Sequence, residues 1–172
     1  MVLSSYSKIN LSLLVNSKQK SGLHNIQSFF CLINLKDKIK IKKINGKNDK
    51  INFTGPFSNL INKQDNSIKS VLVLLRKLKL ISSCYSVVVK KNIPVFAGLG
   101  GGTSNAFTVM KYVLRKKPSK KNFNIIKKKI GSDLELFFYK QAFLKNLSSI
   151  INQRIKQTFF FVLIKPPIKC ST

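Results

Sequence analysis

A cluster of glycines is the stretch of this chain best suited to chemistry. Residues 93–106 read IPVFAGLGGGTSNA and hold half of the chain's eight glycines. Without Cβ atoms, consecutive backbone N–H groups can converge on an anion, and a helix that starts there adds the positive end of its dipole. An ordinary tight turn needs only one or two glycines. We therefore expect this loop to bind phosphate.

The spacing of the glycines excludes the commoner phosphate-binding motifs. A P-loop has a second glycine five residues after the first, followed by Lys and Ser or Thr, but Thr103 stands five residues after Gly98. The dinucleotide and protein-kinase pattern GxGxxG would place its third glycine at Thr103 or Asn105. The loop must therefore belong to another class of phosphate site.

Carboxylates are scarce, which narrows the choice of a catalytic base. The acidic residues are Asp37, Asp49, Asp65, Asp133 and Glu135. Phosphorylation of a hydroxyl needs a carboxylate that can accept the hydroxyl proton. Asp133 follows a glycine at the predicted end of a helix, so we expect it in a turn that faces a cleft, with a cap of the helix or turn as the alternative. Asp37, Asp49 and Asp65 are expected at ordinary solvated positions.

The elements that must position these residues follow from the hydrophobic pattern. Loose alternation predicts strands over residues 3–15 and 26–44, and short apolar or β-branched stretches predict strands over residues 51–54, 85–89, 137–143 and 158–165. Helical spacing and breakers predict helices over residues 66–80, 103–114 and 120–130. We expect a left-handed cap at Gly131, a turn over residues 45–50, and a hairpin or short crossover near residues 18–22. Strands lead and helices group in the middle, so the fold class is α+β.

Length and composition set further bounds. A chain of 172 residues with 44% hydrophobic residues predicts one globular unit with a substantial core. No apolar run approaches the roughly 18 residues of a membrane span, and the N-terminus lacks the pattern of a signal peptide. We therefore expect a cytoplasmic protein with no membrane partner. Cys31, Cys84 and Cys170 lack the spacing of metal ligands and are expected as buried thiols.

The net charge of +27 predicts non-specific attraction to polyanions. Of the 32 basic residues, however, only Arg76, Arg115 and Arg154 are arginine. Arginine is the residue that grips phosphate bidentately and reads base edges. A basic RNA-binding protein remains an alternative interpretation, but RNA binding gives no reason for a glycine loop in front of a helix.

Five segments carry a resemblance to a known family. Residues 94–106, PVFAGLGGGTSNA, resemble the ATP-binding motif of the GHMP small-molecule kinases. Residues 7–15, SKINLSLLV, and residues 21–27, SGLHNIQ, are similar to motifs of the branch that acts on 4-diphosphocytidyl-2-C-methyl-D-erythritol. Residues 131–133 resemble that branch's G-A-D motif, and residues 162–172 resemble the strand and loop that follow. The segments occur in the family's order and cover nearly the whole chain.

The resemblance implies a fold, an activity and cofactors. It implies the ribosomal protein S5 domain 2-like fold of a GHMP kinase N-terminal, ATP-binding domain over residues 1–155. Residues 156–172 would begin a C-terminal domain whose remainder is absent. The implied reaction is ATP-dependent phosphorylation of the 2-hydroxyl of this small-molecule substrate, with Mg²⁺, in non-mevalonate isoprenoid synthesis. Another GHMP small-molecule kinase and an inactive truncated remnant are the alternatives.

The resemblance also assigns catalytic and substrate-binding roles. Asp133 is the implied general base, and Lys8 is the lysine that pairs with it and offsets charge on the transferred phosphoryl group. Asn10, on the same strand face as Lys8, should help to hold the substrate. His24 should hydrogen-bond the cytosine ring. Leu23 replaces a tyrosine that stacks on cytosine in the family, which should weaken substrate binding.

The nucleotide-binding residues implied by the resemblance are Pro94, Gly98, Leu99, Gly100, Gly101, Gly102, Thr103, Ser104 and Asn66. The hydroxyls of Thr103 and Ser104 are expected to cap the helix and to contact phosphate or Mg²⁺. Asn66 should lie near the nucleotide, at the start of the first helix, and ranks below the glycine loop. No residue is assigned as a dedicated metal ligand.

Overall fold

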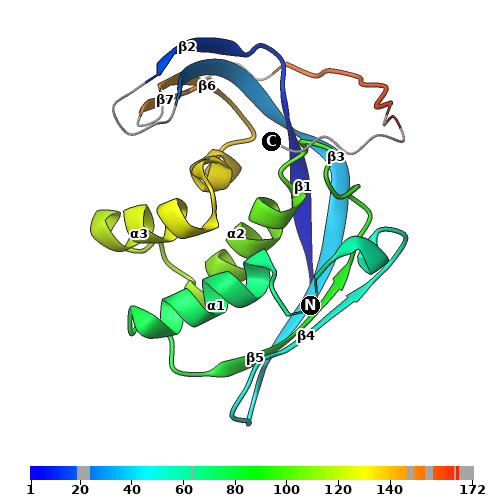
Figure 1. The fold of residues 1–172 in the computed structure, drawn as a ribbon, viewed down its shortest axis with the longest axis vertical. Helices are drawn as coiled ribbons and strands as arrows, with labels where there is room; N and C mark the ends of the chain where they lie inside the picture. The colour runs from blue at the N-terminus through cyan, green and yellow to red at the C-terminus, as the bar shows by residue number, and fades with distance from the viewer. Residues whose placement is uncertain (19–23, 63, 147–148, 154–156, 165, 167–172) are drawn as a thin grey trace.

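The computed structural model describes residues 1–18, 24–62, 64–146, 149–153, 157–164 and 166. Within these residues, seven strands form a curved sheet, and three helices pack against it. The helices gather on one face of the sheet, inside its curve (Figure 1). Strands and helices are thus segregated into two layers around one main core, which confirms the predicted α+β class.

The sheet is built around one long strand. The strands are β1 (Val2–Asn10), β2 (Leu14–Lys18), β3 (His24–Ile44), β4 (Lys50–Thr54), β5 (Cys84–Lys90), β6 (Gln141–Asn146) and β7 (Ser149–Asn152). Both β1 and β2 pair antiparallel with β3, and the remaining strands follow the order β4-β5-β3-β6-β7. Because β1, β5 and β6 all pair with β3, this strand sets their positions relative to one another.

The helices bury apolar stripes against this sheet. They are α1 (Ser67–Lys77), α2 (Gly101–Leu114) and α3 (Lys120–Ile130), with 3-10 turns η1 (Ser58–Leu60) and η2 (Ser132–Phe138). In α1 the buried positions Ile68, Val71, Leu72 and Leu75 recur at helical spacing. They join Val87 and other inward residues of the strands in the core. This packing fixes α2, whose N-terminus follows the glycine loop.

Two of the predicted strands are placed differently in the structure. Residues 3–15 form β1 and β2 rather than one strand, because the chain leaves the ladder after Asn10 and returns to β3 at Leu14. The strand predicted over residues 137–143 is wrong for residues 137–140: Phe137 and Phe138 close η2, and β6 begins at Gln141. Their rings pack against Phe107 of α2, so tertiary contact overrides the strand propensity of these aromatic residues.

The strand predicted over residues 158–165 is also not formed in the described residues 157–164. Phe160, Val162 and Ile164 are almost fully exposed, and residues 157–164 join no strand ladder of the described chain. An apolar run of this length becomes a strand only where a neighbouring strand completes its hydrogen bonds. Lys165 lies outside the described residues.

The helix predicted over residues 120–130 is confirmed, but its cap is not left-handed. Gly131 has φ 143° and ψ 150°, a positive-φ conformation that disfavours side chains without being the left-handed helical region. This backbone turns the chain directly into η2. The position of Asp133 in η2 is set by that turn.

Two of the cysteines can be placed. Cys31 is buried, and burial raises the pKa of its thiol, while Cys84 is half-buried; both are free. Cys170 lies outside the described residues. Within the part of the chain that the structure describes, no helix is both long and apolar enough to cross a membrane.

Candidate active site

The glycine loop connects β5 to α2 and has the backbone that its sequence predicts. Gly98 and Gly100 adopt positive φ angles of 68° and 67°, and α2 begins at Gly101. Gly100 is the N-cap of α2, and no side chain caps this helix. The expectation that Thr103 or Ser104 caps α2 is therefore wrong. The first N–H groups of a helix lack intrahelical partners, so an uncapped N-terminus favours an anion.

A cleft of about 490 Å³ opens along this loop. It lies between the loop, the start of α1 and residues 60–62 and 65–66, and its size suits a small ligand. The predicted nucleotide-binding residues that line it are Asn66, Pro94, Gly98, Leu99, Gly100, Gly101, Gly102 and Thr103. Asn66 is the N-cap of α1, where its side chain accepts a hydrogen bond from the Lys69 N–H at 3.0 Å.

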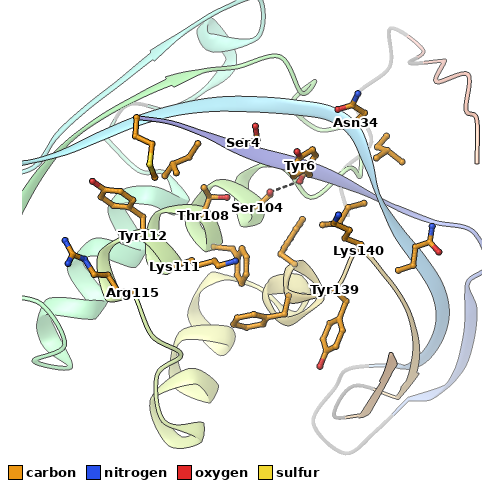
Figure 2. A pocket seen from close by; sticks show the side chains of 18 residues that line it. Ser4, Tyr6, Asn34, Ser104, Thr108, Lys111, Tyr112, Arg115, Tyr139 and Lys140 are labelled. Carbon is orange, nitrogen blue, oxygen red and sulfur yellow. Dashed lines mark hydrogen bonds between the residues drawn. The ribbon is translucent and has the colours of Figure 1, made fainter. Parts of the chain in front are cut away.

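Ser104 is the one predicted nucleotide residue that does not line this cleft. Its buried hydroxyl donates to the Tyr6 carbonyl at 2.6 Å and lies 2.8 Å from the Ser5 hydroxyl. It faces a second cavity, of about 950 Å³, between β1 and β3 on one side and α2 and η2 on the other (Figure 2). Ser104 thus ties α2 to β1, and its predicted contact with phosphate or Mg²⁺ stays a prediction.

The Ser104 contacts lead to a test of this tie. Ser104→Ala removes a buried hydroxyl that joins β1 to the first turn of α2, so we expect it to lower the free energy of unfolding by about 1 kcal/mol. Urea denaturation measures this change. Ser82→Ala, at an exposed serine between α1 and β5, is the control and should leave the urea midpoint unchanged. An equal effect of both substitutions would contradict the tie.

Lys8 and Asp133 meet although they lie far apart in the chain. The Lys8 Nζ donates to Asp133 Oδ2 at 2.9 Å. The Lys8 side chain is 6% exposed and that of Asp133 33%, so the pair joins a buried ammonium to a carboxylate that solvent or substrate can reach. This is the arrangement that a base and its partner cation require.

The Lys8 ammonium also holds Asn10. It donates to Asn10 Oδ1 at 3.2 Å, which confirms that the two residues share a strand face. Ser28 of β3 donates to the same oxygen at 3.1 Å. Ser28 was not expected from the sequence, because its role depends on the pairing of β1 with β3. The three side chains make a polar cluster beside Asp133.

Two contacts join this cluster to the glycine loop. The Lys8 backbone N–H donates to the Leu99 carbonyl at 3.0 Å. The Thr103 hydroxyl lies against Gly131, since a Cβ at Gly131 would be 3.4 Å from Thr103 Oγ1. Gly131 in turn precedes the η2 turn that carries Asp133. The predicted base, its lysine and the phosphate loop therefore form one site.

His24 is not joined to this cluster by a described contact. It is exposed at the start of β3, where its Nδ1 lies 3.4 Å from the Asn16 carbonyl of β2. Its predicted contact with a cytosine ring stays a prediction. Leu23, which departs from the family motif, lies outside the described residues.

Two acidic residues are not solvated as expected. Asp37 is fully buried and paired with Lys91, and Asp49 is almost fully buried and paired with Arg76. Strand parity would have identified Asp37, which alternates with the buried Ile39 and Ile41 along β3. Asp65 is exposed as predicted.

Asn105 is a further residue of the cleft that the sequence did not single out. It lines the cleft from the first turn of α2 and is 2% exposed. Its Oδ1 is buried and has no hydrogen-bond partner among the described residues. Buried amide oxygens are nearly always hydrogen-bonded, so Asn105 Oδ1 is an acceptor that the described residues leave free.

The family model of the GHMP kinases N terminal domain matches residues 66–135, which include the glycine loop and Asp133. A 4-diphosphocytidyl-2-C-methyl-D-erythritol kinase of Pelagibacter ubique (strain HTCC1062) is 40% identical over 173 residues, covering 98% of this chain and 61% of that protein. The enzyme of the same name from Francisella tularensis subsp. tularensis (strain WY96-3418) is 34% identical, with coverage of 98% and 62%. The chain therefore spans about three fifths of the length of these relatives.

Solved structures agree on the fold. A crystal structure of 4-(cytidine 5'-diphospho)-2C-methyl-D-erythritol kinase matches with a TM-score of 0.63 at 23% identity, over 83% of this chain and 51% of that one. Homoserine kinase from Cytophaga hutchinsonii matches with a TM-score of 0.57 at 14% identity, over 88% and 50%. The predicted resemblance is thus confirmed. Residues 66–135 match the GHMP kinases N terminal domain, and nearly the whole chain is similar to 4-diphosphocytidyl-2-C-methyl-D-erythritol kinases.

Proposed function

We propose that this domain serves ATP-dependent phosphorylation of the 2-hydroxyl of 4-diphosphocytidyl-2-C-methyl-D-erythritol, in non-mevalonate isoprenoid synthesis. One observation carries the proposal. The Lys8–Asp133 pair lies beside a glycine loop that ends at an uncapped helix N-terminus, in a chain whose relatives bear the name of that kinase. Residues 1–155 would be the ATP-binding domain and residues 156–172 the start of a second domain.

The cleft fits the phosphates of ATP. Gly98 has no atom within 4 Å of the position where a Cβ would stand, so its backbone is open to a ligand. The N–H groups at the start of α2 would hold the phosphates, and Asn66 and Pro94 would form walls of the nucleotide site. Bound ATP supplies the phosphoryl group that is transferred.

The site offers few protein ligands for Mg²⁺. Among the described residues, no group of three His, Cys, Asp or Glu could hold a metal ion by itself. Mg²⁺ commonly takes one or two protein oxygens and completes its shell with water and substrate phosphates. The Thr103 hydroxyl would offer such an oxygen.

The side chains of this chain would then divide the work. Asp133 would accept the proton of the substrate hydroxyl through its reachable carboxylate. Lys8 would orient Asp133 and offset negative charge that develops on the transferred group. Asn10, held by Lys8 and Ser28, and His24 would bind the substrate.

Two measurements on the purified chain test this proposal. Calorimetric titration with ATP and Mg²⁺ should show binding at one site, and addition of 4-diphosphocytidyl-2-C-methyl-D-erythritol should yield ADP and a phosphorylated product by ³¹P NMR. Homoserine and mevalonate serve as control substrates, because turnover of either would point to another GHMP reaction. A chain that binds no ATP would contradict the proposal.

A further inference from the structure

One buried carboxylate holds the chain at the entrance to the glycine loop. Asp37 of β3 is fully buried. Its Oδ1 accepts hydrogen bonds from the backbone N–H groups of Asn92 at 2.7 Å and Ile93 at 2.9 Å, and its Oδ2 pairs with the Lys91 ammonium. The three residues that lead into Pro94 are therefore fixed to one side chain of the central strand.

The same residues are held from two other sides. The Lys91 N–H donates to the Thr54 carbonyl at 2.7 Å, and the Asn92 side chain donates to the Lys36 carbonyl at 3.0 Å. Gly55 packs so closely that a Cβ there would lie 2.7 Å from the Lys91 carbonyl oxygen. The backbone at Lys91 therefore has little freedom to move.

The Lys91 side chain also supports the start of α2. A Cβ at Gly101 would lie 3.4 Å from the Lys91 Nζ and 3.0 Å from Ile93 Cγ2. The first residue of the helix thus rests on Lys91 and Ile93. The Asp37–Lys91 pair fills the space between the central strand and the helix end that faces the cleft.

A second ion pair lacks this connection. Asp49 pairs with Arg76 and accepts the Tyr85 N–H at 2.9 Å, so it also joins a carboxylate to a cation and a backbone donor. It lies at the opposite end of β5 from the glycine loop. The two pairs are alike in chemistry and differ in what they hold, so Arg76 offers a matched control.

We propose that Asp37 and Lys91 are positioning residues that hold the glycine loop and the start of α2 in the geometry that binds the nucleotide phosphates. The proposal rests on the proposed function, because it assigns the pair an effect on ATP affinity. Buried ion pairs are frequently replaceable by apolar side chains without loss of stability. An ion pair that only stabilises the fold would leave ATP affinity unchanged, whereas a pair that positions the phosphate-binding loop would not.

The experiment compares Lys91→Met, Asp37→Asn, the double variant and Arg76→Met. Lys91→Met and Asp37→Asn should each raise the Kd for MgATP about tenfold, because the loop loses its fixed entrance, while Arg76→Met should leave it within about twofold. Urea midpoints report stability separately. Hydrogen–deuterium exchange should show loss of protection over residues 92–103 in the first two variants and not in Arg76→Met.

Asp37→Asn distinguishes positioning from direct contact with ATP. If Lys91 bound phosphate itself, freeing it from Asp37 would leave ATP affinity equal or tighter, and that result would overturn the proposal. So would a Lys91→Met variant whose midpoint falls while its Kd and loop exchange match Arg76→Met. Where a single variant does not fold, the double variant, which removes both charges, carries the comparison. If the unmodified chain binds no ATP, the proposed function fails, and loop exchange alone decides the positioning role.

Discussion

Asp133→Asn is expected to lower kcat for phosphoryl transfer by about 10²- to 10⁴-fold, while the Kd for MgATP changes little. Asparagine has nearly the same shape, and its amide oxygen can still accept the 2.9 Å hydrogen bond from the Lys8 Nζ. The loss would therefore fall on proton acceptance rather than on the fold. Single-turnover ADP formation with 4-diphosphocytidyl-2-C-methyl-D-erythritol, together with a calorimetric ATP titration, measures both quantities.

Glu135 provides the control for this substitution. It lies in the same 3-10 turn, but its carboxylate pairs with Lys127 of α3 at 2.7 Å rather than with Lys8. Glu135→Gln should leave kcat within about threefold of the unmodified chain, since it removes charge from the turn without touching the Lys8 cluster. Equal rates for Asp133→Asn and the unmodified chain would remove Asp133 from the role of base.

The helices could be predicted from the sequence, because the residues that define a helix and its ends lie within or next to the helix itself. The three helices carry apolar spacing and clear ends, and α1 and α3 begin after the N-caps Asn66 and Ser119. The predictions fail where contacts with other segments of the chain determine the local structure. Phe137 and Phe138 are aromatic residues typical of a strand, yet they pack on Phe107 in a 3-10 turn. Residues 157–164 hold an apolar run of strand length and join no strand ladder in the described chain.

Part of the candidate site could likewise be predicted from the sequence, and part could not. The glycine loop could be assigned to phosphate from its sequence, because the absence of Cβ atoms is itself the property that matters. The pairing of Lys8 with Asp133 followed from the resemblance to a family and not from spacing, since the two residues are 125 positions apart. Asp37 and Lys91 continue the buried parity of β3 and β5, so their burial was open to prediction. The contact between the Asp37 and Lys91 side chains depends on the register between the two strands.

Gly100 connects the phosphate loop to the turn that carries the base, and its replacement tests that connection. It has φ 67°, and a Cβ there would lie 3.1 Å from Phe137 Cζ. Phe137 belongs to η2, the turn that also carries Asp133. Gly100→Ala therefore combines a left-handed backbone strain of about 1 kcal/mol with displacement of a packed ring. We expect a loss of about 2 to 3 kcal/mol in unfolding free energy and a rise of about tenfold in the Kd for MgATP.

Gly98→Ala separates the two causes, because Gly98 has φ 68° but nothing within 4 Å of its Cβ position. It should cost only the backbone strain of about 1 kcal/mol in urea denaturation. Its new methyl group would nonetheless enter the open cleft and weaken MgATP binding. The two variants should thus differ in stability and agree in lost affinity. Equal urea midpoints would show that Phe137 yields freely, and the link from the glycine loop through this ring to Asp133 would fail.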